Sequence, residues 1–150
     1  MGLLSEAAWN TLLGIAVCHR RSLKESMATV NLTGENFQEV VSSNDTVLVD
    51  FWASWCGPCR AFAPVFEAAS TEHPDLVFAK VDTEAEHELA RSFGIMSIPT
   101  LMVFREQVLV YSSSGALPAR SLEDLIGQVK ALDMDEVHRQ VLEATAKRSA

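Results

Sequence analysis

Between residues 29 and 133 the chain alternates short runs of β-branched and apolar residues with longer runs whose apolar residues recur at helical spacing. The runs 46–53 and 76–82 are apolar almost throughout, which indicates strands covered on both faces. Strands separated by helices need crossover connections, which make neighbouring strands parallel and place helices on both faces of the sheet. The runs 100–105 and 107–113 are joined by a tight turn and predict an antiparallel hairpin. The pattern therefore predicts an α/β fold with a mixed central sheet flanked by helices.

The order of these runs is β-α-β-α-β-α-β-β-α. It starts with a short strand at 29–32 and ends with a helix at 121–133. A chain of this length has the usual size of one domain. We therefore expect an N-terminal extension (1–26), one domain (27–133) and a helical tail (134–150) that packs only in part. The other helices are expected at 33–43, 60–73 and 84–93.

The apolar stretch 12–18 resembles the core of a signal peptide but lacks its flanks. No Lys or Arg precedes it, whereas Glu6 does, and the basic residues 19–21 come after it. The stretch is also far shorter than the roughly 20 residues that span a bilayer. We expect an amphipathic or disordered leader, with export or lipid anchoring through Cys18 as the alternative.

The composition is 48% hydrophobic and 21% charged, with a net charge of −8, which is typical of a globular protein. Negative charge argues against a nucleic-acid partner, which requires clustered Lys and Arg, and no segment predicts a membrane partner. Three cysteines are too few for a disulfide scaffold, and their odd number leaves one thiol unpaired. This use of cysteine favours a reducing compartment, so we expect a cytoplasmic protein.

Cys56 and Cys59 lie in the stretch WCGPC, directly after the apolar run 46–53. They could bind a metal, form a structural disulfide or exchange electrons. A structural zinc site needs four ligands, and no second cysteine pair is present, so we expect no metal. The histidines are scattered without the spacing of metal ligands: His19, His73, His87 and His138. A disulfide across two residues restrains the unfolded chain only slightly, so electron exchange fits best.

Electron exchange requires a thiolate. We expect Cys56 at the N-terminus of the following helix, with Gly57 and Pro58 in the first turn. Unpaired backbone N–H groups and the helix dipole lower the pKa of such a thiol, from about 8.5 toward about 7 in CxxC motifs. Cys59 lies one turn further along on the same face, where it can resolve a mixed disulfide.

The stretch WCGPC after VDFWA, together with SIPT at 97–100, resembles the thioredoxin family over residues 29–132. The resemblance implies a thioredoxin fold and a general protein disulfide reductase. Such a protein holds no bound cofactor and receives electrons from NADPH through a thioredoxin reductase. Its clients are disulfide-containing proteins, and a monomer is the usual state. The Gly-Pro dipeptide between the cysteines is that of the strongly reducing members.

By this resemblance Cys56 is the attacking cysteine, Cys59 the resolving one, and the two form the redox-active disulfide. Asp50 matches a buried aspartate that accepts the proton of the resolving thiol, and Lys80 matches a lysine near that acid. The residues alone also indicate that a carboxylate within VLVDFWA is costly to bury, so its pKa should rise. The alternatives are that Asp50 reaches solvent at a strand end and that Lys80 is simply solvated.

The resemblance also implies a groove that binds extended client peptides. It implies a cis bond between Ile98 and Pro99, facing the cysteines, with the backbone of Ile98 pairing with the client as an added strand. The proline would also keep metals away from the thiols. Gly115 matches a glycine that lines the groove, although it could be an ordinary turn glycine. The other expected groove residues are Trp55, Gly57 and Pro58.

One tryptophan and one proline are expected to have structural roles near the cysteines. Trp52 either holds the active-site loop or is part of the core, and Pro64 should kink the helix that contains it. The chain also departs from the family pattern. Glu106 and Gln107 replace the usual Asn-Gly, which predicts a less regular hairpin turn. Met96 replaces the usual arginine before the Ile-Pro pair, which changes the charge of the groove.

Two other functions remain open. A binding subunit would need the shape but not the thiols, so replacing both cysteines by serine would separate it from a reductase. A thiol oxidase or isomerase would have a much higher redox potential than glutathione.

The segment that starts at Met27 resembles the beginning of a typical family member. Residues 1–26 are therefore either native or the translation of sequence upstream of the true start.

Overall fold

The computed structural model describes residues 28–150, in which five strands form one mixed sheet. The strands are β1 (Thr29–Asn31), β2 (Thr46–Trp52), β3 (Val77–Asp82), β4 (Thr100–Arg105) and β5 (Val108–Ser114). Their order across the sheet is β1-β3-β2-β4-β5. Strand β3 is parallel to β1 and β2, whereas β4 is antiparallel to β2 and β5. The predicted α/β fold with a mixed sheet is therefore confirmed.

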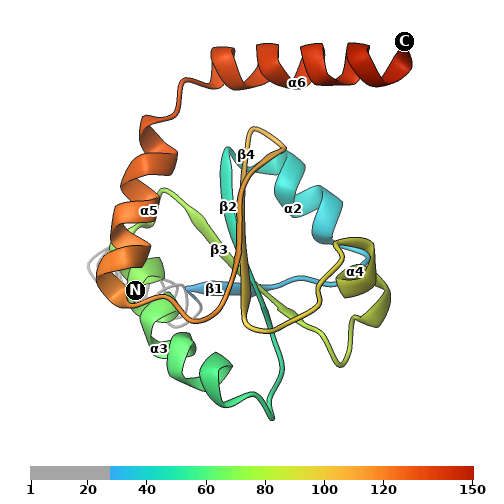
Figure 1. The fold of residues 1–150 in the computed structure, drawn as a ribbon. Helices are drawn as coiled ribbons and strands as arrows, with labels where there is room; N and C mark the ends of the chain where they lie inside the picture. Colours follow the sequence, from blue (N-terminus) through green and yellow to red (C-terminus); the bar gives the residue numbers. More distant parts are fainter. Residues whose placement is uncertain (1–27) are drawn as a thin grey trace, which may run out of the picture.

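Helices cover both faces of this sheet (Figure 1). They are α2 (Phe37–Ser43), α3 (Gly57–Glu72), α4 (His87–Ser92), α5 (Ala119–Ala131) and α6 (Met134–Ser149). One apolar core lies between the sheet and helices α3 and α5, and a second core joins the opposite face to α2 and α4. No helix within residues 28–150 combines the length and apolar character that crossing a bilayer requires. Cys18 and the predicted leader lie outside the described residues.

Strand β2 runs through the middle of the sheet, and the alternation of its side chains determines which face Asp50 points to. Val49 and Phe51 belong to the core on the α2 and α4 side, whereas Leu48 belongs to the core under α3 and α5. Successive side chains of a strand point to opposite faces, so Asp50 shares the face of Leu48. The same alternation places Lys80 beside Phe78 on that face, which is the one that α3 covers.

The turn between β4 and β5 consists of Glu106 and Gln107, whose φ angles are 48° and 67°. Two residues in the left-handed region are what a two-residue hairpin loop requires, so the turn is regular although neither residue is glycine. The prediction of a less regular turn is therefore wrong. The pairing register shifts between Val103 and Phe104, inside the strand.

The C-terminal helices α5 and α6 contact the β4–β5 hairpin at its turn. The Arg105 guanidinium Nη1 donates to three carbonyl oxygens at the end of α5, those of Val129, Lys130 and Leu132. Asp133 caps α6 by accepting from the backbone N–H groups of the first turn. His138 lies 2.6 Å from Glu106, and Met134 is buried, but most of α6 runs beyond the sheet and is exposed (Figure 1).

Candidate functional site

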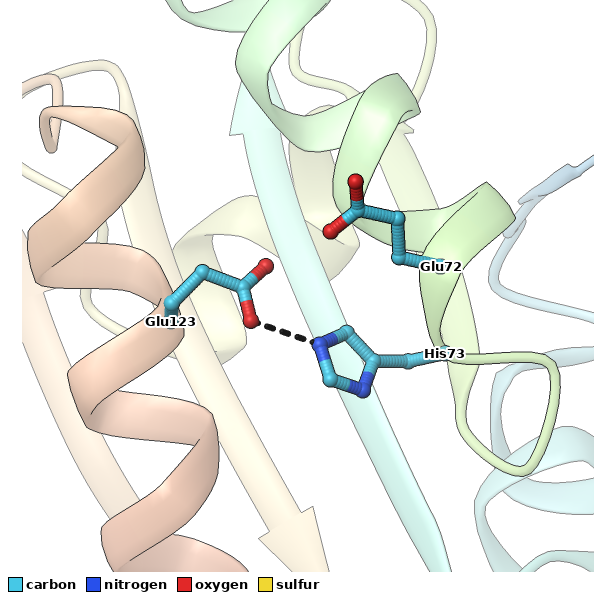
Figure 2. Close-up of side chains that lie close together, drawn as sticks. All are labelled: Glu72, His73 and Glu123. Atoms are coloured by element: carbon cyan, nitrogen blue, oxygen red, sulfur yellow. Dashed lines mark hydrogen bonds and ion pairs between the residues drawn. The ribbon is translucent and has the colours of Figure 1, made fainter.

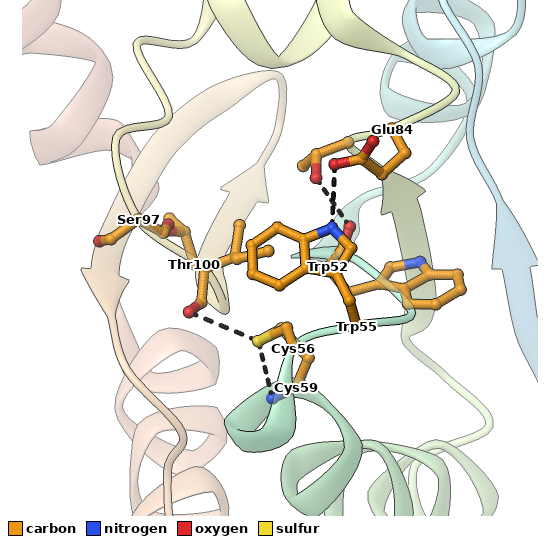
Figure 3. The surroundings of a disulfide bond; sticks show 9 residues. Trp52, Trp55, Cys56, Cys59, Glu84, Ser97 and Thr100 are labelled. Atoms are coloured by element: carbon orange, nitrogen blue, oxygen red, sulfur yellow. Dashed lines mark hydrogen bonds between the residues drawn. A yellow bond between two sulfur atoms is a disulfide. The ribbon is translucent and has the colours of Figure 1, made fainter.

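Cys56 and Cys59 form a disulfide at the point where the chain passes from β2 into α3 (Figure 3). Their Cα atoms are 5.2 Å apart, and both side chains are buried, with exposures of 4% and 2%. Together with Ala53 they form a small apolar cluster, against which Trp52 and Ile98 pack. The pair is therefore within bonding distance, as dithiol–disulfide exchange requires.

Cys56 is the N-cap of α3, as predicted from the sequence. The backbone N–H of Cys59 donates to its sulfur at 3.2 Å, in the manner of a capping hydroxyl. Gly57 and Pro58 form the first turn, where a missing proline N–H removes no helical hydrogen bond. Pro64 lies inside the same helix. An anion on Cys56 would thus face a donated N–H and the positive end of the helix dipole.

The loop before β4 brings the Ile98–Pro99 bond to this disulfide, and that bond is cis. The carbonyl oxygen of Ile98 lies 3.7 Å from the sulfur of Cys56. Gly115 donates its N–H to the carbonyl of Pro99 at 2.8 Å and has a φ of 103°, which side-chain-bearing residues rarely adopt. The structure therefore brings together Cys56, Ile98, Pro99 and Gly115, which are separated in the sequence.

Asp50 is fully buried, so the alternative that it reaches solvent is wrong. Burial raises the pKa of its carboxyl from 3.8 to about 7, while the nearby positive charge of Lys80 acts to lower it. Neither carboxyl oxygen has a hydrogen-bond partner among residues 28–150. A buried group whose pKa lies near neutral pH can both accept and release a proton under physiological conditions.

Lys80 is partly buried beside this acid. It is the register partner of Asp50 in the neighbouring strand, and its Nζ lies 4.9 Å from the ring centre of Trp52. Trp52 packs against the cysteine pair, and its carbonyl accepts both the N–H and the hydroxyl of Thr83. A hollow of about 220 Å³ is lined by Trp52 and Lys80 together with acidic and polar residues, including Asp82.

Trp55 is 65% exposed, and its indole N–H donates to Glu84 at 3.0 Å (Figure 3). A groove of about 540 Å³ opens between this tryptophan, Ile98 and the fully exposed Met96. Sequence reasoning did not identify Glu84. The parallel pairing of β2 with β3 could have indicated it, because Trp52 and Asp82 are register partners and the segments after them lie at one edge of the sheet.

The comparisons with known proteins agree with this geometry. The thioredoxin family model matches residues 28–128. The chain is 59% identical over 120 residues to putative thioredoxin 2 of Streptomyces coelicolor, covering 80% of this chain and 90% of that protein.

Two solved structures are also similar. A single-residue mutant of thioredoxin from Halobacterium salinarum has a TM-score of 0.65 and 34% identity, covering 69% of this chain and 92% of that one. A chain from work on the thiol resolving mechanism in yeast mitochondrial 1-Cys peroxiredoxin via glutathione/thioredoxin systems has a TM-score of 0.62 and 27% identity. That match covers 67% of this chain and 94% of the other.

Proposed function

The chain belongs to the thioredoxin family of disulfide oxidoreductases, and from this membership we propose how its residues share the work of dithiol–disulfide exchange. Cys56 is the attacking thiolate and Cys59 the resolving thiol. The observation that carries this assignment is the position of Cys56 as N-cap of α3, with the N–H of Cys59 directed at its sulfur. The exposures of the two cysteine residues are too similar to tell the attacking cysteine from the resolving one.

The reaction starts with the reduced dithiol. The Cys56 thiolate attacks one sulfur of a client disulfide, and the other client sulfur leaves as a thiolate, so that a mixed disulfide joins Cys56 to the client. The client backbone pairs with that of Ile98 as an added strand, which holds the target sulfur near Cys56. The walls of the groove that holds the client are formed by five residues: Trp55, Gly57, Pro58, Pro99 and Gly115.

Asp50 then acts on Cys59 as a general base. It takes the thiol proton, directly or through water, and the Cys59 thiolate attacks the Cys56 sulfur of the mixed disulfide. The second client sulfur leaves as a thiolate, and the Cys56–Cys59 disulfide remains. The client has gained two electrons, which the protein dithiol has lost. Support comes from the burial of Asp50 and from its place on the face of the sheet that α3 covers.

Lys80 serves as a positioning residue for this step. Its positive charge lowers the pKa of Asp50, which burial alone would raise further. Without such a cation a buried carboxyl would hold its proton more tightly and would be less ready to release it at neutral pH, so fewer molecules would carry the free base. Trp52 and Pro64 support the loop and the helix that carry the cysteines.

The oxidised protein must be reduced again before another cycle. We propose that NADPH supplies the two electrons through a thioredoxin reductase, with no cofactor bound to this chain. Disulfide-containing proteins are its clients. The similar chain studied with a 1-Cys peroxiredoxin supports clients of this kind.

We further propose a cytoplasmic monomer built of one thioredoxin domain at 27–133, with the 1–26 extension and the 134–150 tail outside the catalytic unit. The family match to residues 28–128 supports this division. An odd number of cysteines supports a reducing compartment.

Reduction of insulin disulfides tests the function. The full chain, supplied with NADPH and a flavoprotein reductase, should reduce insulin with turnover, whereas the variant with both Cys56→Ser and Cys59→Ser should give only the uncatalysed rate. The redox potential should lie near the value of about −270 mV that is typical of thioredoxins. A potential well above that of glutathione would instead assign an oxidase or isomerase.

A further inference from the structure

Three metal-binding side chains meet on the side of the molecule where α3 ends against α5 (Figure 2). Glu72 is the last residue of α3, His73 is its C-cap, and Glu123 projects from α5. One ligand atom from each lies within 4.8 Å of the others. Neither the thiol chemistry nor the client groove uses these residues.

The histidine in this cluster is held in place by its surroundings. Its backbone N–H donates to the carbonyl of Ala69, and its own carbonyl accepts from the N–H of Leu76. The His73 side chain is only 20% exposed, and its Nε2 lies 2.7 Å from a carboxylate oxygen of Glu123. The imidazole is therefore fixed at the junction of two helices, with its nitrogen directed at an anionic ligand.

We propose that Glu72, His73 and Glu123 form a binding site for a divalent transition-metal ion, Zn²⁺ in particular. A tetrahedral Zn²⁺ has N and O ligands at about 2.0–2.2 Å, which places the ligand atoms about 3.4 Å from one another. Nε2 of His73 and the Glu123 oxygen, now 2.7 Å apart, would separate slightly to admit the ion, and the exposed side chain of Glu72 is free to turn toward it. Two carboxylates balance the charge of the ion, and the fourth position is left for water.

The imidazole sets the choice of metal. Mg²⁺ and Ca²⁺ prefer oxygen ligands only, whereas Zn²⁺ accepts imidazole together with carboxylates. His73 and Glu123 are far apart in the sequence, where the histidines are scattered and predict no metal site. The fold brings them together.

Lys130 contacts the other ring nitrogen of His73 and is itself paired with Asp75. Nζ of Lys130 lies 3.4 Å from Nδ1 of His73 and 2.8 Å from a carboxylate oxygen of Asp75. A lysine that donates to Nδ1 leaves the proton on Nε2, where the metal would bind. Metal-bound histidine instead carries its proton on Nδ1 and donates it to an outer acceptor. Zinc binding therefore requires Lys130 to turn away, and removal of this cation should strengthen the binding of zinc.

The chain offers a matched control. His138 also contacts a glutamate, Glu106, at 2.6 Å. Within residues 28–150 no third ligand joins that pair, whereas Glu72 joins His73 and Glu123. A histidine–glutamate pair alone and a three-ligand site can thus be compared in one molecule.

The test is calorimetric titration of the full chain with ZnCl₂. The Cys56–Cys59 disulfide is kept oxidised and Cys18 is alkylated, so that no thiol competes for the metal. We expect saturable binding of one ion, weakened at least about tenfold in His73→Gln, Glu72→Gln and Glu123→Gln. His138→Gln should bind as the parent does, and Lys130→Met should bind more tightly.

Imidazole NMR of the unsubstituted protein gives a second measurement that does not depend on the folding of variants. Zinc should shift the ring signals of His73 and leave those of His138 unchanged. Binding that does not saturate, equal shifts at both histidines, or affinity unchanged by Glu72→Gln and Glu123→Gln would overturn the proposal. Any of these results would mean that single histidines capture zinc adventitiously.

Discussion

Replacing Asp50 by asparagine removes a buried ionisable group and keeps its shape. Asp50 has no exposed surface, and its pKa is raised by burial from 3.8 to about 7. At low pH both the folded and the unfolded chain carry the proton, so Asp50→Asn should change stability little. Between pH 3.8 and about 7 the unfolded chain ionises while the folded chain keeps its proton. The parent therefore loses stability relative to the variant as the pH rises through this range.

The size of the effect follows from the pKa difference. Each pKa unit corresponds to about 1.4 kcal/mol, so the variant should be more stable by about 4 kcal/mol once the pH exceeds the folded-state pKa. For a chain of this length that is roughly 10 °C in Tm. The benefit should grow from about pH 4 to about pH 7 and then level off.

Urea unfolding of both oxidised proteins across this pH range and above it measures the difference. Asp124→Asn, which changes an exposed acid on α5, is the control and should have little effect. A stability difference between Asp50→Asn and the parent that stays constant with pH would refute the reasoning, because it would mean that Asp50 ionises alike in both states.

Three further changes test other parts of the structure. Cys59→Ser should accumulate a mixed disulfide between Cys56 and insulin on non-reducing gels, and failure to trap one would contradict the assigned order of attack. Gly115→Ala should lower the free energy of unfolding by about 1–3 kcal/mol because φ is 103° there. Gly127→Ala, in the exposed middle of α5, is the control and should raise the free energy of unfolding by about 0.5–1 kcal/mol. Equal effects of the two substitutions in urea unfolding would contradict the argument from backbone conformation. Arg105→Met should cost about 1.5–3 kcal/mol because three carbonyls at the end of α5 lose a charged donor, and an unchanged urea midpoint would show that water replaces it.

Local patterns were sufficient to predict most of the fold. The nearly continuous apolar runs at 46–53 and 76–82 predict central strands because only strands covered on both faces tolerate such runs. The same runs indicate that Asp50 is buried, but they leave open that it reaches solvent at the end of its strand, and the structure decides for burial. Cys56 as a helix N-cap follows from the glycine and proline after it.

Contacts between distant segments could not be predicted in this way. The bond from Trp55 to Glu84 depends on β2 and β3 ending at one edge of the sheet, and the contact of His73 with Glu123 depends on how α3 packs against α5. The hairpin turn was expected to be irregular because Glu106 and Gln107 are poor residues for it. The pairing of β4 with β5 imposes the left-handed conformation nevertheless.

The whole exchange reaction starts from a sulfur anion on Cys56, which the first turn of α3 stabilises. The pH dependence of iodoacetamide alkylation of Cys56 in the reduced full chain measures this directly, with the modified residue identified by mass spectrometry. The alkylation rate should be half-maximal at about pH 7. A midpoint at or above about 8.5, the pKa of a cysteine in water, would mean that the helix does not stabilise the thiolate.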